Sequence, residues 1–109
     1  VRARGVLDAA RPGLRRSGDA VRLRTVTNML GAAAFAVGAL DEARAAWEAA
    51  RTLAVRDGDA LTEARATANL GAVAHIAGDV QGALSCYRRA LAAYARLGVV
   101  RGLAECWHN

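Results

Sequence analysis

The sequence predicts an all-α protein built from stacked helix pairs, and three observations carry this prediction. Similar segments recur 40 residues apart, so that Leu30-Gly31 returns as Leu70-Gly71, and a fixed period of this size is typical of repeat architectures. Alanine, the residue with the highest helix propensity, fills 28 of the 109 positions. No segment shows the alternation of apolar and polar residues that marks a strand.

Proline, glycine and aspartate residues indicate where the helices begin and end. Pro12 should end or kink the first helix, because proline lacks the backbone donor and clashes with the preceding turn. Gly38 and Gly78 suit the left-handed residue that ends a helix. The residues that suit the N-cap, which starts the next helix, are Asp19, Asp59 and Asp79. Helices are therefore expected near residues 2–11, 20–37, 40–56, 60–77, 80–96 and 99–109.

Two glycines fall inside the expected helices rather than at their ends. Gly31 and Gly71 each cost a helix about 1 kcal/mol relative to alanine. A helix accepts this cost where a neighbouring group must come close, and Trp47 and Tyr87 are the large side chains at matching positions of the period. We therefore expect Trp47 and Tyr87 to lie over these glycines, in equivalent layers of the stack.

Residues inside the period identify the repeat. Thr27-x2-Leu30-Gly31-x2-Ala34 and its copy 40 residues later correspond to the motif W-x2-L-G-x2-Y, and Ala43-x3-Trp47 and Ala83-x3-Tyr87 correspond to A-x3-F. The chain therefore resembles the tetratricopeptide repeat family over its whole length. It departs from the family pattern in lacking the terminal proline and in having a period of 40 instead of about 34 residues. Such long repeats are similar to those of spindle-orientation adaptors, kinesin light chains and large bacterial transcriptional regulators.

The resemblance implies a right-handed α-solenoid of antiparallel helix pairs, with about 2.5 repeats. Residues 1–17 would form the second helix of a truncated repeat, 18–57 the first full repeat and 58–97 the second. Residues 98–109 would supply the first helix of a truncated third repeat. A chain cut inside the motif in this way is expected to be a piece of a larger protein.

Composition restricts the function further. The formal charge is +5 and all fifteen basic residues are arginine, a pattern that together with abundant alanine indicates GC-rich codon usage more than nucleic-acid binding. Arginines alternating with acidic residues on helices usually form a solvated face, although the excess favours acidic partners. RNA-reading helical arrays have a period near 35 with paired polar residues, so no nucleic acid is expected. The longest uncharged run, residues 25–40, is shorter than the ~20 apolar residues that span a membrane.

No residue pattern predicts catalysis or a cofactor. Cys86 and Cys106 lack metal or redox spacing, and free thiols suit a cytoplasmic location. His75 and His108 do not belong to a helix-borne metal motif. The serines lack a neighbouring base, and no glycine-rich phosphate loop follows a strand. We therefore expect neither enzymatic activity nor a bound metal.

The resemblance also implies a binding site, because the first helix of each tetratricopeptide repeat lines a concave groove. Asn69 and Asn109 stand at equivalent positions, where an amide can both donate to and accept from a peptide bond. The carboxylate clamp of chaperone-binding members is not reproduced, since Ala32 replaces its Asn and Glu105 stands where a Lys is needed. The expected groove residues are Thr25, Asn28, Phe35, Arg65, Asn69, Ala72, His75, Glu105 and Asn109.

The sequence thus predicts a protein-interaction module, or scaffold, in a larger cytoplasmic regulatory protein from a bacterium. It would bind an extended or helical segment of a protein or peptide, acidic rather than basic. The alternative is a structural segment that self-associates as a homodimer, because the terminal helices expose apolar residues such as Leu103 and Trp107. Arrays with fewer than about three repeats and no polar capping helix are expected to be marginally stable or to associate.

Overall fold

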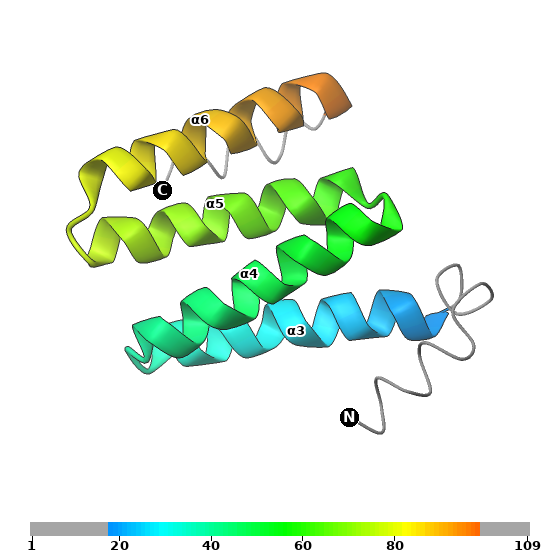
Figure 1. The fold of residues 1–109 in the computed structure, drawn as a ribbon, viewed down its shortest axis with the longest axis horizontal. Helices are drawn as coiled ribbons and strands as arrows, with labels where there is room; N and C mark the ends of the chain where they lie inside the picture. Colours follow the sequence, from blue (N-terminus) through cyan, green and yellow to red (C-terminus); the bar gives the residue numbers. More distant parts are fainter. Residues whose placement is uncertain (1–17, 99–109) are drawn as a thin grey trace.

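A computed structural model describes residues 18–98 of the chain as an all-α structure with four helices and no strand in that range (Figure 1). These helices are α3 (Gly18–Ala36), α4 (Leu40–Asp57), α5 (Ala60–Ile76) and α6 (Val80–Leu97). Each lies within two residues of the predicted bounds. The helices predicted for residues 2–11 and 99–109 lie outside the described residues.

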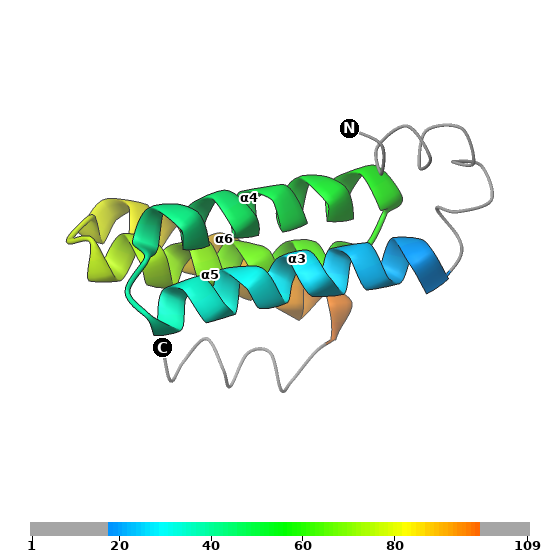
Figure 2. The same cartoon turned by 90° about the horizontal axis from the view of Figure 1, so that it is seen from below.

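The helices form two antiparallel pairs, α3 with α4 and α5 with α6, and α4 joins the pairs by packing against α5 as well. In Figure 2, α4 lies along one side of the bundle, next to both α3 and α5. Helices α3 and α5 touch only at a few points. Consecutive helices therefore stack, as in a repeat array, instead of enclosing one central core.

Tight turns at glycine connect the helices. Gly38 and Gly78 have φ angles of 79° and 86°, which confirms their predicted left-handed conformation. Gly58 and Gly98 have the same conformation, with φ of 72° and 69°, although it was predicted only for Gly38 and Gly78. Gly38, Gly58 and Gly78 let the chain reverse immediately after a helix, since a residue with a side chain would be strained there.

Two of the three predicted N-caps are confirmed. The Asp59 carboxylate accepts from the backbone N–H of Thr62 at 3.1 Å, and that of Asp79 accepts from Gly82 N–H at 2.9 Å. The prediction for Asp19 was wrong, because α3 already includes Gly18 and no left-handed glycine interrupts the chain there. Asp19 instead lies in the first turn of α3, where it pairs with Arg22 and its charge is favourable to the helix dipole.

The core of the described residues consists of two small clusters, one among α3, α4 and α5 and the other between α5 and α6. Ala43 and Trp47 of α4 pack with Val73 of α5 in one cluster, against which Phe35, Leu40 and Leu70 also pack. In the other, Ala64 and Ala68 of α5 pack with Ala90 and Tyr94 of α6. Alanine supplies three of the four buried residues of the second cluster, so α5 and α6 approach closely there.

The helical glycines have the predicted large partners. A Cβ atom on Gly31 would lie 2.5 Å from Nε1 of Trp47, and one on Gly71 would lie 2.9 Å from Cε1 of Tyr87. Both distances are shorter than ordinary carbon contacts. Trp47 and Tyr87 thus occupy equivalent layers, although Trp47 is buried and Tyr87 is half-buried.

Candidate functional site

The predicted groove residues that the structure describes lie on α3 and α5, the first helices of the two repeats. Thr25 and Arg65 are exposed, whereas Asn28, Asn69 and Ala72 are half-buried. Arg65 and Ala72 lie four residues before and three residues after Asn69, so they share its side of α5. Glu105 and Asn109 lie outside the described residues.

Asn28 and Asn69 bring the two helices together. The Asn69 Nδ2 group donates to Asn28 Oδ1 at 3.2 Å, although α3 and α5 otherwise make few contacts. The Asn28 backbone carbonyl also accepts a hydrogen bond of 3.0 Å from Trp47 Nε1. The same residue therefore connects α3 to α4 through its backbone and to α5 through its side chain.

This amide pair retains hydrogen-bonding capacity. The bond between the two side chains uses Asn69 Nδ2 and Asn28 Oδ1, and among residues 18–98 the other two amide atoms, Asn28 Nδ2 and Asn69 Oδ1, have no hydrogen-bond partner. Because both side chains are only half-buried, one donor group and one acceptor remain within reach of solvent. A peptide bond offers the complementary acceptor and donor, so the pair can bind the backbone of an extended segment irrespective of its sequence.

Two other predicted residues lie at the margins. The Phe35 ring packs against Trp47, with ring centroids 5.6 Å apart and planes at 46°, so much of its surface belongs to the core cluster. His75 is exposed near the end of α5. It follows Asn69 by six residues, which turns it by about 120° around the helix. Neither residue lies directly beside the amide pair.

Sequence reasoning missed a buried ionic junction at Arg24. Its guanidinium donates from Nη1 to Asp57 at 2.7 Å and from Nε to Asp59 at 3.0 Å, joining α3 to the turn between α4 and α5. The Arg24 side chain is 11% exposed and that of Asp57 only 1%, so this arginine does not belong to a solvated face. Arg44 and Arg65 do lie on the surface, as the sequence indicated.

The junction stabilises the ionised carboxylates. Burial opposes ionisation of Asp57, but hydrogen bonds and charge from Arg56 and Arg24 outweigh it, so its pKa lies below the usual value. Burial likewise opposes ionisation of Asp59, and the bonds from Thr62 together with the charge of Arg24 lower its pKa. A comparison within the sequence could have indicated the junction, because Arg24 occupies the position that Ala64 fills in the next repeat.

The two hollows described on residues 18–98 lie away from the predicted groove. One, of about 250 Å³, lies between α5 and α6 and is lined by residues such as Ala64, Thr67 and Arg96. The other, between α4 and α6, has Arg51, Arg56 and Arg89 around Glu63. Neither of these two hollows is lined by Asn28 or Asn69.

No other chemistry gathers in this part of the chain. Among residues 18–98, no three His, Cys, Asp or Glu side chains are placed to hold a metal ion. Asp79 follows His75 by four residues, but its carboxylate caps α6. Of the helices described, none is long and apolar enough to cross a membrane.

A family model described as Tetratricopeptide repeat matches residues 22–96, which span all four described helices. No curated protein and no solved structure matches the chain.

Proposed function

The chain belongs to the tetratricopeptide repeat family, whose repeats are typically protein–protein interaction modules without catalytic activity, and on this premise we propose that its α3–α5 face binds an extended segment of a partner protein. The hydrogen-bonded pair Asn28–Asn69 is the observation that carries the proposal. It places the polar residues of two repeats side by side, and its remaining donor and acceptor match a peptide bond.

Arg65 supplies a preference for acidic partners in this proposal. It lies one helical turn before Asn69 on the same side of α5, and it is exposed. Arg65 forms no ion pair with another residue in the range 18–98. An acidic side chain of a peptide held by Asn69 would come within reach of this guanidinium, which can form bidentate bonds with a carboxylate.

We also propose that this module belongs to a larger regulatory protein of the bacterial cytoplasm. The support is the 40-residue period, which resembles the long repeats of bacterial multidomain regulators. In such a protein the open face would relay a signal by contact with a partner.

Peptide selection followed by substitution tests the binding face. Random peptides displayed on phage would be panned against the purified chain, and the affinity of a selected peptide would be measured by fluorescence anisotropy. Asn69→Ala should weaken binding by about 1–3 kcal/mol, roughly 5- to 150-fold, because a buried amide contact is lost. Gln81→Ala, at an exposed amide on α6, is the matched control and should leave the affinity unchanged.

Charge reversal tests the role of Arg65. Arg65→Glu should slow association with an acidic peptide and reduce the dependence of the association rate on salt. Arg88→Glu makes the same change of charge at an exposed position of α6 and should have a much smaller effect. Selected peptides should be enriched in Asp and Glu.

One outcome would contradict peptide binding by the α3–α5 face. If helices of the parent protein normally fill this face, Asn69→Ala and Arg65→Glu would lower the melting temperature of the larger protein and leave peptide affinity unchanged. Asn69→Ala should cost the isolated chain about 1 kcal/mol in any case, through the lost bond to Asn28. Affinities are therefore compared well below the melting temperature, where every variant is folded.

A further inference from the structure

The hollow between α4 and α6 gathers arginine side chains from two helices. It has a volume of about 470 Å³ and lies at the end of the molecule where α4 ends and α5 begins (Figure 1). Its lining residues are Arg51, Thr52, Val55 and Arg56 of α4, Glu63 of α5 and Arg89 of α6. Three guanidinium groups therefore face one carboxylate, and the net formal charge of the lining is positive.

The guanidinium groups of this hollow retain most of their hydrogen-bond donors. Among residues 18–98, the side chains of Arg51 and Arg89 form no hydrogen bond or ion pair. Arg56 donates from Nε to Oδ1 of Asp57 at 3.1 Å, and its Nη1 and Nη2 groups have no partner in that range. Because the Asp57 side chain is almost completely buried, this bond holds the Arg56 guanidinium in place while its two outer nitrogens remain available.

The repeat fold does not require arginine at two of these three positions. Adding the 40-residue period to Arg51 gives Leu91, and subtracting it from Arg89 gives Ala49. Helices α4 and α6 are the second helices of their repeats, and each forms with an apolar residue where the other has an arginine. The two unpaired guanidinium groups are therefore not needed to build either helix, and a ligand would explain why both lie around one hollow.

Three guanidinium groups suit a phosphate group better than a carboxylate. A phosphate monoester has a charge of about −2 near neutral pH and three acceptor oxygens, whereas a carboxylate has one charge and two oxygens. Glu63 opposes the entry of further negative charge, so a nucleic acid, which brings many phosphates, fits less well. Val55 is exposed beside these charges and offers an apolar contact to residues that flank a phosphate on a polypeptide.

We propose that this hollow binds a phosphorylated serine or threonine side chain of a partner protein. The phosphate would lie between the three guanidinium groups, and the Thr52 hydroxyl can donate a further hydrogen bond. Arg65 follows Glu63 by two residues, which turns it by about 200° around α5. The hollow therefore lies on a different side of α5 from the proposed peptide-binding face, and the proposal does not rest on that face.

Nuclear magnetic resonance of the arginine side chains tests the proposal. The isotope-labelled full chain would be titrated with acetyl-Gly-phosphoserine-Gly-amide. The Nε–Hε signals of Arg51, Arg56 and Arg89 should shift with one common dissociation constant. The signal of Arg88, an exposed neighbour on α6 that does not line the hollow, should stay in place. The same peptide with glutamate in place of phosphoserine should bind about tenfold more weakly, because it has fewer charge-assisted hydrogen bonds.

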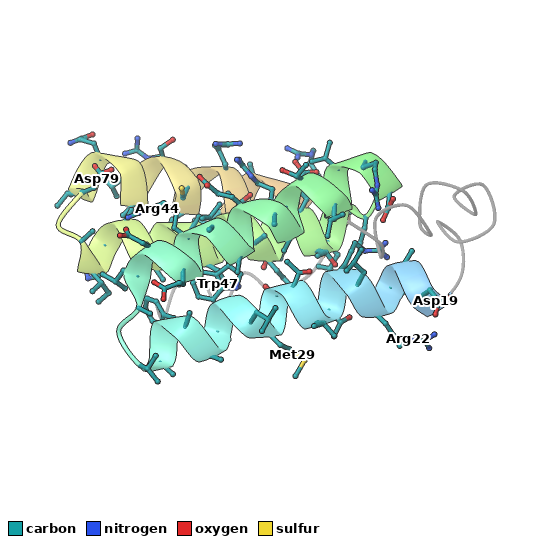
Figure 3. All side chains as sticks on the ribbon, turned by 60° about the horizontal axis from the view of Figure 1, so that its bottom comes forward. Asp19, Arg22, Met29, Arg44, Trp47 and Asp79 are labelled. Atoms are coloured by element: carbon teal, nitrogen blue, oxygen red, sulfur yellow. The ribbon has the colours of Figure 1, made fainter. Side chains whose placement is uncertain are left out.

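Substitution by methionine removes the charge of an arginine and keeps an unbranched side chain. Arg51→Met and Arg89→Met should each weaken phosphopeptide binding about tenfold, since a charge-assisted hydrogen bond is lost. Arg88→Met and Arg44→Met are the matched controls, and each should change the affinity less than about twofold, because charges outside the hollow are screened. Arg44 lies near the start of α4 (Figure 3), where it pairs with an acidic residue of its own helix. Glu63→Gln should strengthen binding by removing the opposing charge.

Several results would overturn the proposal. Equal losses in Arg88→Met and Arg89→Met would show that binding reflects net charge alone, and an absence of shifts would show that the hollow does not bind the phosphopeptide. Inorganic phosphate or the glutamate peptide bound as tightly as the phosphopeptide would assign the hollow to other anions. A short thymidine oligonucleotide that binds more tightly, and is weakened by Arg89→Met, would assign it to nucleic acid. Melting temperatures from circular dichroism would show that each variant is folded.

Discussion

Replacing Gly31 by alanine should destabilise the protein, although alanine is the better helix former. The new Cβ would lie 2.5, 2.6 and 2.8 Å from Nε1, Cδ1 and Cε2 of Trp47. The indole must therefore move by about 1 Å to reach an ordinary contact distance. Trp47 is buried and packs against Phe35, so it cannot move without disturbing the first core cluster.

The change in the free energy of unfolding caused by Gly31→Ala is the sum of three contributions. Alanine in place of glycine gains about 1 kcal/mol of helix propensity, and overpacking a core costs about 1–3 kcal/mol. Displacing the indole by that distance also breaks its 3.0 Å hydrogen bond to the Asn28 carbonyl, and a buried donor left unpaired costs about 1–3 kcal/mol. We expect a net loss of about 3 kcal/mol in the free energy of unfolding, a large part of the stability of a small domain.

Urea unfolding followed by circular dichroism at 222 nm measures this difference by linear extrapolation. Gly71→Ala is the matched control, since its Cβ meets the half-buried Tyr87 at 2.9 Å and should change stability by less than about 1 kcal/mol. Trp47→Phe removes the indole nitrogen, so Gly31→Ala should cost less in that background. An unchanged cost in Trp47→Phe, or a Gly31→Ala variant as stable as the wild type, would refute the reasoning.

Three further predictions concern the ionic junction and the caps. Arg24→Met should lower the free energy of unfolding by about 3 kcal/mol, because it leaves the buried Asp57 without one of its partners; a loss no larger than that of Arg44→Met, at a surface pair, would contradict it. The folded-state pKa values of Asp57 and Asp59 lie below the unfolded value of about 3.9, so the stabilisation by these two carboxylates is complete above that pH and is lost as pH falls through the folded-state pKa values. Melting temperatures measured from pH 6 to pH 2 should show this decline, and Arg24→Met should make the decline smaller. Asp79→Ala should cost about 1 kcal/mol by removing the cap of α6, whereas Asp41→Ala, at a carboxylate that does not cap, should cost less by the same urea assay.

The fold could be predicted from sequence because several independent signals agreed. The Leu-Gly pairs, the Ala-x3-aromatic pairs and the glycines that end helices all recur at one period, and each has a local physical cause. Helix bounds followed to within two residues for the same reason. Asp19 was the exception, since the matching Gly18 does not adopt the left-handed conformation of Gly58, and the repeat pattern contains no signal for that difference.

The candidate site was predictable only in part. Asn28 and Asn69 were each identified from the family pattern, but their mutual hydrogen bond joins positions that are 41 residues apart and therefore not equivalent in the repeat. Whether two such side chains meet depends on how one repeat is rotated on the next, which periodicity does not encode. The burial of Arg24 was missed because its partners Asp57 and Asp59 are 33 and 35 residues away, and the only local sign was an arginine at the position that Ala64 fills in the next repeat.

In equivalent layers of the two repeats, the large and the small side chains come from opposite helices, and this difference bears on the relative orientation of the repeats. In the second repeat α5 contributes the small Ala64 and Ala68, and α6 contributes the large Tyr94. At the equivalent positions of the first repeat, α3 contributes the large Arg24 and Asn28, and α4 the small Ala54.

Since these two α3 residues are polar, each can reach beyond its own repeat, Arg24 to Asp59 and Asn28 to Asn69. Hydrogen bonds and ion pairs are directional, unlike alanine contacts, and α3 touches α5 at few other points. The polar residues of the first repeat therefore add directional contacts between α3 and α5 to the packing of α4 on both helices, and the donor and acceptor proposed to bind a partner belong to the same set of contacts.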